Sequence, residues 1–518
     1  MELVIRSADL LDGSGAPAFR ADIGIDGDTI VAIGDLSMAV AGKTIDGTGC
    51  VVTPGFIDIH SHSDYTLPIN PQAESKIRQG VTTEVVGMCG GSAAPLDEAS
   101  RARAVASNPD LPWEEWTTFG EFLAFLQQQG TSVNVVPFVG HGTVRGLAMG
   151  LGERAPTEDE LSEMKRLVAQ AMDEGAWGMS TGLIYPPSVY GETEELVELS
   201  RVPARRGGFY FSHIRGEGAT LLDAVAEAIE IGERAGLPVQ IAHFKASGID
   251  NWDLLPQALS LLDAALERGV DVMADRYPYI ASSTGLGASL PHWAHDGGRD
   301  ALLDRLRDTT ARKQILDDPE PQSTRWDKIV IAYVPDHSEW EGQSVAEIAA
   351  QRGTDPDVTA LDLLLEAEGR VSVIRFGMSE ENLCAVLRHP AIVIGSDGSA
   401  RAPYGVLGQG KAHPRNYGTF PRVLGCYARE QGVLSLAEAV HKMTGKTAGR
   451  LRLGDRGLLR EGYKADLVIL NPETVGDAGT FTDPYQYPNG IEAVLVNGQV
   501  VIDHGNHTGA RPGRVLSL

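Results

Sequence analysis

The sequence predicts an α/β protein: a (β/α)8 TIM barrel with a small β-sandwich domain built from both chain termini and an inserted lid region. Three observations predict this architecture. The chain has 518 residues, which is enough for a large α/β core and a second module. Short apolar runs alternate with amphipathic stretches through the middle of the chain. Both ends have instead the pattern of short strands joined by turns.

The two ends are expected to form one small β domain from residues 1–53 and 455–518. LVIRSADLLDG and ADIGIDGDTIVAIG near the start have strand character, as do GLLREGYKADLVILNP and IEAVLVNGQVVIDHG near the end. Asp-Gly and Asn-Gly pairs in these stretches are typical of hairpin turns. The larger domain, residues 54–454, is then inserted between the two halves of the small one.

The large domain is predicted to be the barrel because strand and helix patterns alternate along it. EDELSEMKRLVAQAMDEG, TLLDAVAEAIEIGERAG and LPQALSLLDAALERG have the three-to-four apolar spacing of helices. A barrel of this class needs eight strands. We expect them in GFIDIH, TTEVVGMC, VNVVPFVGH, AWGMST, FYFSH, VQIAH, DVMADRY and AIVIGSD.

Two further apolar segments, IVIAYV and VSVIRFGM, lie between the seventh and last of these strands. They are assigned to an insertion at about residues 285–370, and either could displace the seventh strand. A long insertion near the mouth of a barrel is often a lid over the site.

Composition excludes some classes of partner. The formal net charge is −26, which argues against nucleic acid because phosphate binding needs basic surfaces. The first residues, MELVIRSADLLDG, lack the pattern of a signal peptide, and no apolar run reaches the roughly 20 residues of a membrane helix. The four cysteines, Cys50, Cys89, Cys384 and Cys426, are scattered. We therefore expect a cytoplasmic protein with free thiols, and no nucleic-acid or membrane partner.

The stretch GFIDIHSHSDYT, residues 55–66, is the first candidate for a metal site. Alternate residues of a strand share a face, so Asp58, His60, His62 and Asp64 are expected to point the same way. The α-carbons of the two histidines would then lie about 6.6 Å apart, which suits a metal ion. A polar strand end hydrogen-bonded within a loop is the alternative.

Other strand ends carry similar groups. Cys89, His141, His213, His243 and Asp397 end the second, third, fifth, sixth and last predicted strands. The carboxyl ends of barrel strands form the active site, so these side chains should meet at one rim. Imidazoles with one thiolate favour zinc, and a catalytic zinc keeps an open position for water. Asp397 is placed to exchange a proton with that water, although it could simply occupy an Asp-Gly turn.

With these residues in view, the sequence resembles the amidohydrolase superfamily, through HSHSD after GFID, the strand-end histidines and SDG at the last strand. More narrowly it resembles the D-aminoacylases, the N-acyl-D-amino-acid deacylases. GMCGGSAAP, VGHGTVR, GMSTGLIYPP, SHIRGEG, DRYPYIASST and HPRNYGTFPRVLG carry this resemblance. Hydantoinases and dihydroorotases have a carbamylated lysine on the fourth strand, whereas the fourth strand here, WGMSTG, has no lysine.

The resemblance implies a metal-dependent hydrolase with a defined set of ligands. A tight zinc would be held by Cys89, His213 and His243. A second, weaker position would use His60 and His62, with Cys89 available as a bridge. Asp397 would take a proton from the attacking water and later give it to the departing amine.

The resemblance also implies the substrate, an N-acyl-D-amino acid cleaved to a carboxylate and a free D-amino acid. The residues expected to hold its α-carboxylate are Lys245, Tyr277, Ser283 and Arg375. Lys245 could instead be a solvated loop residue, and Tyr279 could replace Tyr277. Arg375 could pair with Glu380 or Glu381. His141 and Arg215 have no assigned role.

The side chain of the substrate is expected to be apolar, as in derivatives of D-Leu, D-Phe or D-Trp. The stretch SLPHWAHDGG near the lid offers Leu290, His292, Trp293 and His295 and no arginine before Arg299.

Two other functions stay open: a cyclic amidohydrolase like the hydantoinases or dihydroorotases, and a barrel that binds ligands without catalysis. No oligomeric state is predicted.

Overall fold

The computed structural model describes residues 1–319 and 325–518. Residues from both ends of the chain form one nine-stranded sheet with the order β21-β20-β19-β18-β5-β1-β2-β3, in which β4 also pairs with β1. Strand β5 joins the two halves by pairing antiparallel with β18, where Val52 lies opposite Ile469. The strands are β1 (Leu3–Leu10), β2 (Phe19–Asp26), β3 (Thr29–Gly34), β4 (Lys43–Asp46), β5 (Val51–Pro54), β18 (Leu467–Leu470), β19 (Ile491–Val496), β20 (Gln499–Asp503) and β21 (Asn506–His507).

Strand β1 changes its partner halfway along the terminal sheet. Its first half pairs in parallel with β4, and its second half pairs in parallel with β5. The register shifts between Ile5 and Ala8, and Ser7 has a φ of 60°. Such a bulge bends a strand and increases its twist. The bend allows the first half of β1 to pair with β4 and the second half with β5.

The middle of the chain forms two parallel sheets, β6-β7-β8 and β9-β10-β11-β12-β13-β17. At one junction of the two sheets, only Phe138 separates β8 from β9 along the chain. At the other, Ser61 after β6 pairs with Gly398 after β17, so the outer edges of the two sheets meet there as well. The strands are β6 (Phe56–Asp58), β7 (Val81–Val86), β8 (Asn134–Pro137), β9 (Val139–Gly140), β10 (Gly178–Gly182), β11 (Phe209–His213), β12 (Val239–Ile241), β13 (Val272–Arg276) and β17 (Ile392–Ile394).

All eight stretches expected to form parallel strands do so, and the seventh is DVMADRY because β13 pairs with both β12 and β17. Helices follow the strands in the expected alternation. They are α1 (Glu74–Ile77), α2 (Glu98–Ser107), α3 (Phe119–Gln129), α4 (His141–Met149), α5 (Glu158–Asp173), α6 (Thr193–Ala204), α7 (Leu221–Ala235), α8 (Leu255–Glu267), α13 (Glu380–Arg388), α14 (Arg415–Arg422), α15 (Leu436–Met443) and α16 (Gly445–Arg450).

Helix α5 illustrates how the local sequence defines these helices. The Thr157 hydroxyl accepts a hydrogen bond from the backbone N–H of Glu160, and the Glu160 carboxylate accepts one from the N–H of Thr157. This capping box satisfies N–H groups that have no partner within the first turn. Met164, Val168 and Ala171 recur at helical spacing and are buried. None of the helices in the described part of the chain is both long and apolar enough to cross a bilayer.

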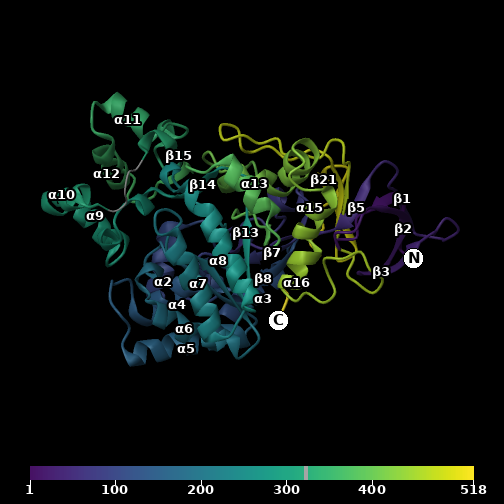
Figure 1. Ribbon diagram of the computed structural model, residues 1–518, viewed down its shortest axis with the longest axis horizontal. Helices are drawn as coiled ribbons and strands as arrows, with labels where there is room; N and C mark the ends of the chain where they lie inside the picture. Colours follow the sequence, from purple (N-terminus) through teal and green to yellow (C-terminus); the bar gives the residue numbers. More distant parts are fainter. Residues whose placement is uncertain (320–324) are drawn as a thin grey trace.

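The two additional apolar segments belong to a separate antiparallel sheet. IVIAYV forms β15 (Ile329–Tyr333) and VSVIRFGM forms β16 (Ser372–Phe376), which lies between β14 (Ala281–Gly285) and β15. Helices α9 (Arg299–Arg307), α10 (Thr309–Asp317), α11 (Val345–Arg352) and α12 (Pro356–Glu366) complete the inserted segment, which has its own apolar core. Figure 1 shows these helices at the end of the molecule opposite to β1, β2 and β3.

A buried ion cluster joins the first and last parallel strands. Lys76 Nζ on α1 lies 2.6 Å from Asp58 Oδ2 and 3.3 Å from Glu84 Oε1, and all three side chains are fully buried. Lys76 also donates to the Ser396 hydroxyl, and Asp58 accepts from the Ser396 N–H at 2.8 Å. Since Ser396 immediately precedes Asp397, this cluster holds the segment after β17 against the end of β6.

Replacement of Lys76 by methionine is expected to lower the free energy of unfolding by about 3–5 kcal/mol, because two carboxylates would stay buried without their cation. Urea denaturation measures this loss. The matched control is Lys43→Met, since Lys43 pairs with Asp503 at the exposed surface. That change should stay within about 0.5 kcal/mol. Equal stabilities of the two variants would show that the buried cluster does not stabilise the fold.

Candidate metal centre

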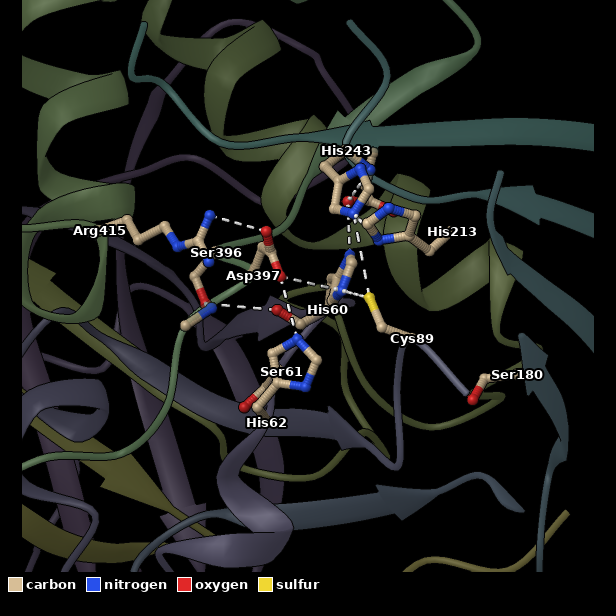
Figure 2. Close-up of polar contacts among 12 residues, drawn as sticks. His60, Ser61, His62, Cys89, Ser180, His213, His243, Ser396, Asp397 and Arg415 are labelled. Atoms are coloured by element: carbon tan, nitrogen blue, oxygen red, sulfur yellow. Dashed lines mark hydrogen bonds and ion pairs between the residues drawn. The ribbon is translucent and has the colours of Figure 1, made fainter. Parts of the chain in front are cut away.

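Five of the predicted side chains converge at the carboxyl edge of the parallel sheets. His213 is the last residue of β11, while the others follow their strands by two or three residues. Figure 2 shows their side chains facing one another. These residues are His60, Cys89, His213, His243 and Asp397.

The ligand atoms of four of these residues lie close enough to share a metal ion, and those of His213, Glu217 and His243 form a second such group. Those of His60, Cys89, His243 and Asp397 all lie within 4.8 Å of one another. Cys89 Sγ is 3.3 Å from His60 Nε2 and 3.9 Å from His243 Nε2. His243 Nε2 is in turn 2.9 Å from Nδ1 of His213. One thiolate among imidazole nitrogens is a donor set that fits zinc.

His62 joins this group through Asp397, but the two neighbouring acids do not. His62 Nε2 lies 3.0 Å from Asp397 Oδ1. The expectation that Asp58, His60, His62 and Asp64 share one face is wrong, because β6 ends at Asp58 and a short 3-10 helix begins at Ser63. Asp58 belongs to the ion cluster of Lys76, and Asp64 accepts a hydrogen bond from the N–H of Ala93.

Three residues of the site have an unusual backbone conformation. Cys89, His243 and Asp397 have φ values of 52°, 34° and 50°. This left-handed region disfavours L-residues other than glycine by roughly 1–2 kcal/mol per residue. Strain of this kind is tolerated where the surrounding structure imposes it, and it is common at functional sites. Here it turns three side chains of adjoining loops toward one point.

The electrostatic surroundings favour the thiolate form of Cys89. Burial raises the pKa of its thiol, but the positive charge of His60 and hydrogen bonds with His213 and His243 outweigh burial and hold the pKa well below its usual value. The thiolate is the form of cysteine that binds metal. Burial, together with the charge of His243, lowers the pKa of His213, which favours the neutral ring. The Nε2 atom of His213 is buried and has no hydrogen-bond partner within the described ranges.

The fourth expected strand, which has no lysine, contributes a serine that contacts the loop after β7. The Ser180 hydroxyl on β10 donates to the carbonyl of Gly87 at 2.5 Å and accepts from the N–H of Gly90 at 3.1 Å. Ser180 therefore holds the loop that carries Cys89.

Sequence reasoning missed two acids that orient the histidines. Asp275, on β13, lies with Oδ1 3.1 Å from His60 Nδ1 and accepts from the backbone N–H of His243 at 3.0 Å. Glu217 Oε1 lies 2.7 Å from His243 Nδ1. Their positions offered a signal, since Asp275 precedes Arg276 at the end of a predicted strand and Glu217 follows His213 by four residues.

Arg415 is a third residue that sequence reasoning missed, although it lies in the HPRNYGTFPR stretch. Its Nη1 lies 2.7 Å from Asp397 Oδ2, an ion pair without hydrogen-bond geometry. Its guanidinium carbon lies 4.8 Å from the centre of the Tyr277 ring. Burial raises the pKa of Asp397, but Arg415 and His60 outweigh burial and hold it well below its usual value. Its surroundings therefore favour the ionised form of Asp397.

The residues expected to bind the substrate line one cavity of about 300 Å³, together with metal-site residues. The predicted set in its wall is Lys245, Tyr277, Ser283 and Arg375, beside His62, Cys89, His213, His243 and Asp397. His60, which is fully buried, lies behind this wall. The same surface thus contains both the candidate metal ligands and cationic and hydroxyl groups.

Two of these residues have unused hydrogen-bonding capacity. Within the part of the chain that the structure describes, the Tyr277 hydroxyl is buried without a partner. The guanidinium group of Arg375 likewise makes no hydrogen bond or ion pair there, and Glu380 instead accepts from the Tyr427 hydroxyl. Tyr279 does not line the cavity; its hydroxyl lies 3.4 Å from Asp477.

Other sequence candidates lie outside the cavity. His141 is buried between Ser188 and Glu195, at 2.7 and 2.8 Å, and Arg215 pairs with Glu227. The four residues of SLPHWAHDGG considered for the substrate side chain are also absent from the cavity wall. Its apolar part comes instead from Tyr65, Met88, Ile184 and Tyr185, which sequence reasoning did not identify.

Comparison with known proteins agrees with this geometry. An amidohydrolase family model matches residues 43–502. A D-aminoacylase of Alcaligenes xylosoxydans xylosoxydans is 38% identical, covering 100% of this chain and 97% of that protein. The N-acyl-D-glutamate deacylase of the same organism is also 38% identical, covering 100% and 96%.

A solved structure of a deacylase also matches this chain over its full length. The N-acyl-D-glutamate deacylase of Bordetella bronchiseptica, determined with zinc and a phosphonate mimic of the tetrahedral intermediate, is 34% identical with a TM-score of 0.85, and both chains are covered completely. The chain therefore belongs to the amidohydrolase family, in its D-aminoacylase branch.

Proposed function

We propose that this protein is a zinc-dependent N-acyl-D-amino-acid deacylase, which hydrolyses the amide bond to a carboxylate and a free D-amino acid. The observation that carries the proposal is a cavity that joins a thiolate–imidazole cluster, an ionised aspartate and an arginine side chain that has no partner among the described residues. Amide hydrolysis needs the first two groups, and recognition of the substrate carboxylate needs the third.

Cys89, His213 and His243 are proposed to hold the tight zinc. His60 and His62 would hold a second, weaker ion, with Cys89 as the bridge. The close approach of the ring nitrogens, with His243 Nε2 2.9 Å from His213 Nδ1, supports this proposal, because such groups gain from a shared cation. Zinc bound there supplies Lewis-acid chemistry, polarising a carbonyl and acidifying water.

Asp397 is proposed to be the general base and acid. It would take a proton from the attacking water and deliver it to the nitrogen of the leaving amine. Its Oδ1 faces His60 and His62, and its Oδ2 faces Arg415, so the carboxylate is held from both sides. This arrangement directs the carboxylate toward the cluster and limits its rotation.

Arg375, Lys245, Tyr277 and Ser283 are proposed to bind the α-carboxylate of the substrate. Arg375 has the strongest support, because its guanidinium group lies in the cavity wall with no partner in residues 1–319 and 325–518, and such a group can bind a carboxylate through two hydrogen bonds. The apolar wall of Tyr65, Met88 and Ile184 supports a substrate with an apolar side chain, such as that of D-Leu, D-Phe or D-Trp.

We also propose the finer architecture and the location. The two parallel sheets would close into one (β/α)8 barrel within residues 54–454, and the bent terminal sheet would form a β-sandwich from residues 1–53 and 455–518. The inserted segment, at about residues 285–370, would act as a lid. The meeting of Ser61 with Gly398 and the bulge in β1 support the first two points. A cytoplasmic location is proposed from the composition alone.

The direct test is hydrolysis of N-acetyl-D-leucine and N-acetyl-L-leucine by zinc-replete protein, followed by release of free amine. The D form is expected to react at least about 100-fold faster, because only one enantiomer can place its carboxylate at Arg375 and its amide at the metal site at the same time. Faster turnover of the L form would contradict the proposed stereochemistry. Turnover of neither would contradict the proposed apolar preference and direct the assay to acidic D-amino acids and then to cyclic amides.

The metal assignment is tested by Cys89→Ala. This variant is expected to lose zinc and, with it, more than about 100-fold of its activity. Loss of a residue that only hydrogen-bonds to a metal ligand already lowers metal affinity or activity about 10–100-fold, so loss of a ligand itself should cost more. Metal analysis and amine release measure the two effects. Cys426→Ala is the matched control, since Cys426 is half-buried beside Gln431. Full zinc and activity in the Cys89 variant would mean that the ligand set is wrong.

The role of Asp397 is tested by Asp397→Ala. Turnover is expected to fall about 10²–10⁴-fold, the usual contribution of a general acid–base group, while zinc stays bound. Steady-state kinetics and metal content are measured on the same preparation, with the highly exposed Asp300→Ala as the control. Loss of zinc would make Asp397 a ligand, and normal turnover would exclude its role in proton transfer.

A further inference from the structure

Glu217 occupies a position between the candidate metal ligands and the candidate substrate residues. It follows β11 by four residues and lines the cavity. Its Oε1 lies 2.7 Å from His243 Nδ1, and the same atom accepts a hydrogen bond from Lys245 Nζ. One carboxylate oxygen therefore contacts a proposed zinc ligand and a proposed substrate-binding cation.

The two nitrogens of His243 face different surroundings. Nε2 faces the cluster, 2.9 Å from His213 Nδ1 and 3.9 Å from Cys89 Sγ. A nitrogen that binds metal must offer a lone pair, so the proton of the neutral ring must be on Nδ1. That tautomer needs a hydrogen-bond acceptor near Nδ1, and Glu217 Oε1 lies 2.7 Å from it, at ion-pair distance.

Lys245 favours the opposite tautomer. Its Nζ lies 2.9 Å from the same Nδ1 atom. An ammonium group is only a donor, so a lysine bonded to Nδ1 would require a lone pair there and would move the ring proton to Nε2. A protonated Nε2 cannot bind metal. The acceptor and the donor thus compete for one ring nitrogen.

We propose that Glu217 is a positioning residue that selects the metal-binding tautomer of His243 by accepting from Nδ1 and drawing the Lys245 ammonium onto itself. This inference rests on the proposed function, because it takes His243 as a zinc ligand.

The proposal distinguishes Glu217 from a residue that only packs against the site. If Glu217 merely oriented the ring, its removal would weaken zinc binding regardless of Lys245. If it opposes Lys245, removal of the lysine as well should restore zinc binding. A double-mutant comparison isolates this interaction between the two side chains.

The experiment measures the zinc affinity of the full chain by competition with a chromophoric chelator. Glu217→Leu is expected to lower the affinity about 10–100-fold, the range for partners of metal-ligating histidines. Glu217→Leu/Lys245→Met is expected to recover most of that loss, and Lys245→Met alone to bind zinc at least as well as wild type. Glu230→Gln, which alters an exposed surface pair on α7, is the control and should match wild type.

Glu217→Gln is a second variant that should fold normally, because glutamine has the shape of glutamate and keeps one acceptor oxygen. It therefore separates loss of zinc affinity from misfolding. It is expected to lose less affinity than Glu217→Leu and to regain it in Glu217→Gln/Lys245→Met, with unchanged circular dichroism. Affinities of both Glu217 variants within about twofold of wild type would overturn the proposal, as would double variants that bind no better than the single ones. A wild-type protein without zinc affinity would instead refute the proposed metal centre.

Discussion

The contact of Lys76 with Asp58 and Ser396 is the interaction on which the site depends most. It joins the end of β6, which leads to His60, with the end of β17, which leads to Asp397. These segments are separated by more than 300 residues of the chain, and they meet at this edge of the sheets. A buried cation that bridges two carboxylates is costly to disrupt, so the two ends stay in register.

Opposite charges alternate throughout the site. The Cys89 thiolate lies among histidines, Asp397 between Arg415 and His60, and Glu217 between His243 and Lys245. Buried charges are tolerated when each has a partner of opposite sign. Arg375 differs from this pattern, because it lines the cavity without a partner in the described residues. An anionic substrate would complete the arrangement.

The strained backbone and the charge network both fix the positions of the side chains in the site. The left-handed conformations of Cys89, His243 and Asp397 turn these side chains inward, and Ser180, Asp275 and Arg415 hold them there. A site held by such contacts needs little rearrangement when it binds a ligand, which is the condition for electrostatic stabilisation of a transition state. Glu217 adds a link between the metal side and the substrate side of the cavity.

The sequence by itself determined the parallel strands and the groups at their ends, because period-two and three-to-four patterns and the common edge of parallel strands are local rules. Through a family resemblance it also predicted four residues of the cavity wall, which are Lys245, Tyr277, Ser283 and Arg375. Only the tertiary structure decided the partners of those groups. Glu217, Asp275 and Arg415 act across loops from different strands, and IVIAYV and VSVIRFGM join a separate sheet. Such contacts depend on distances between remote segments, and no local pattern encodes those distances.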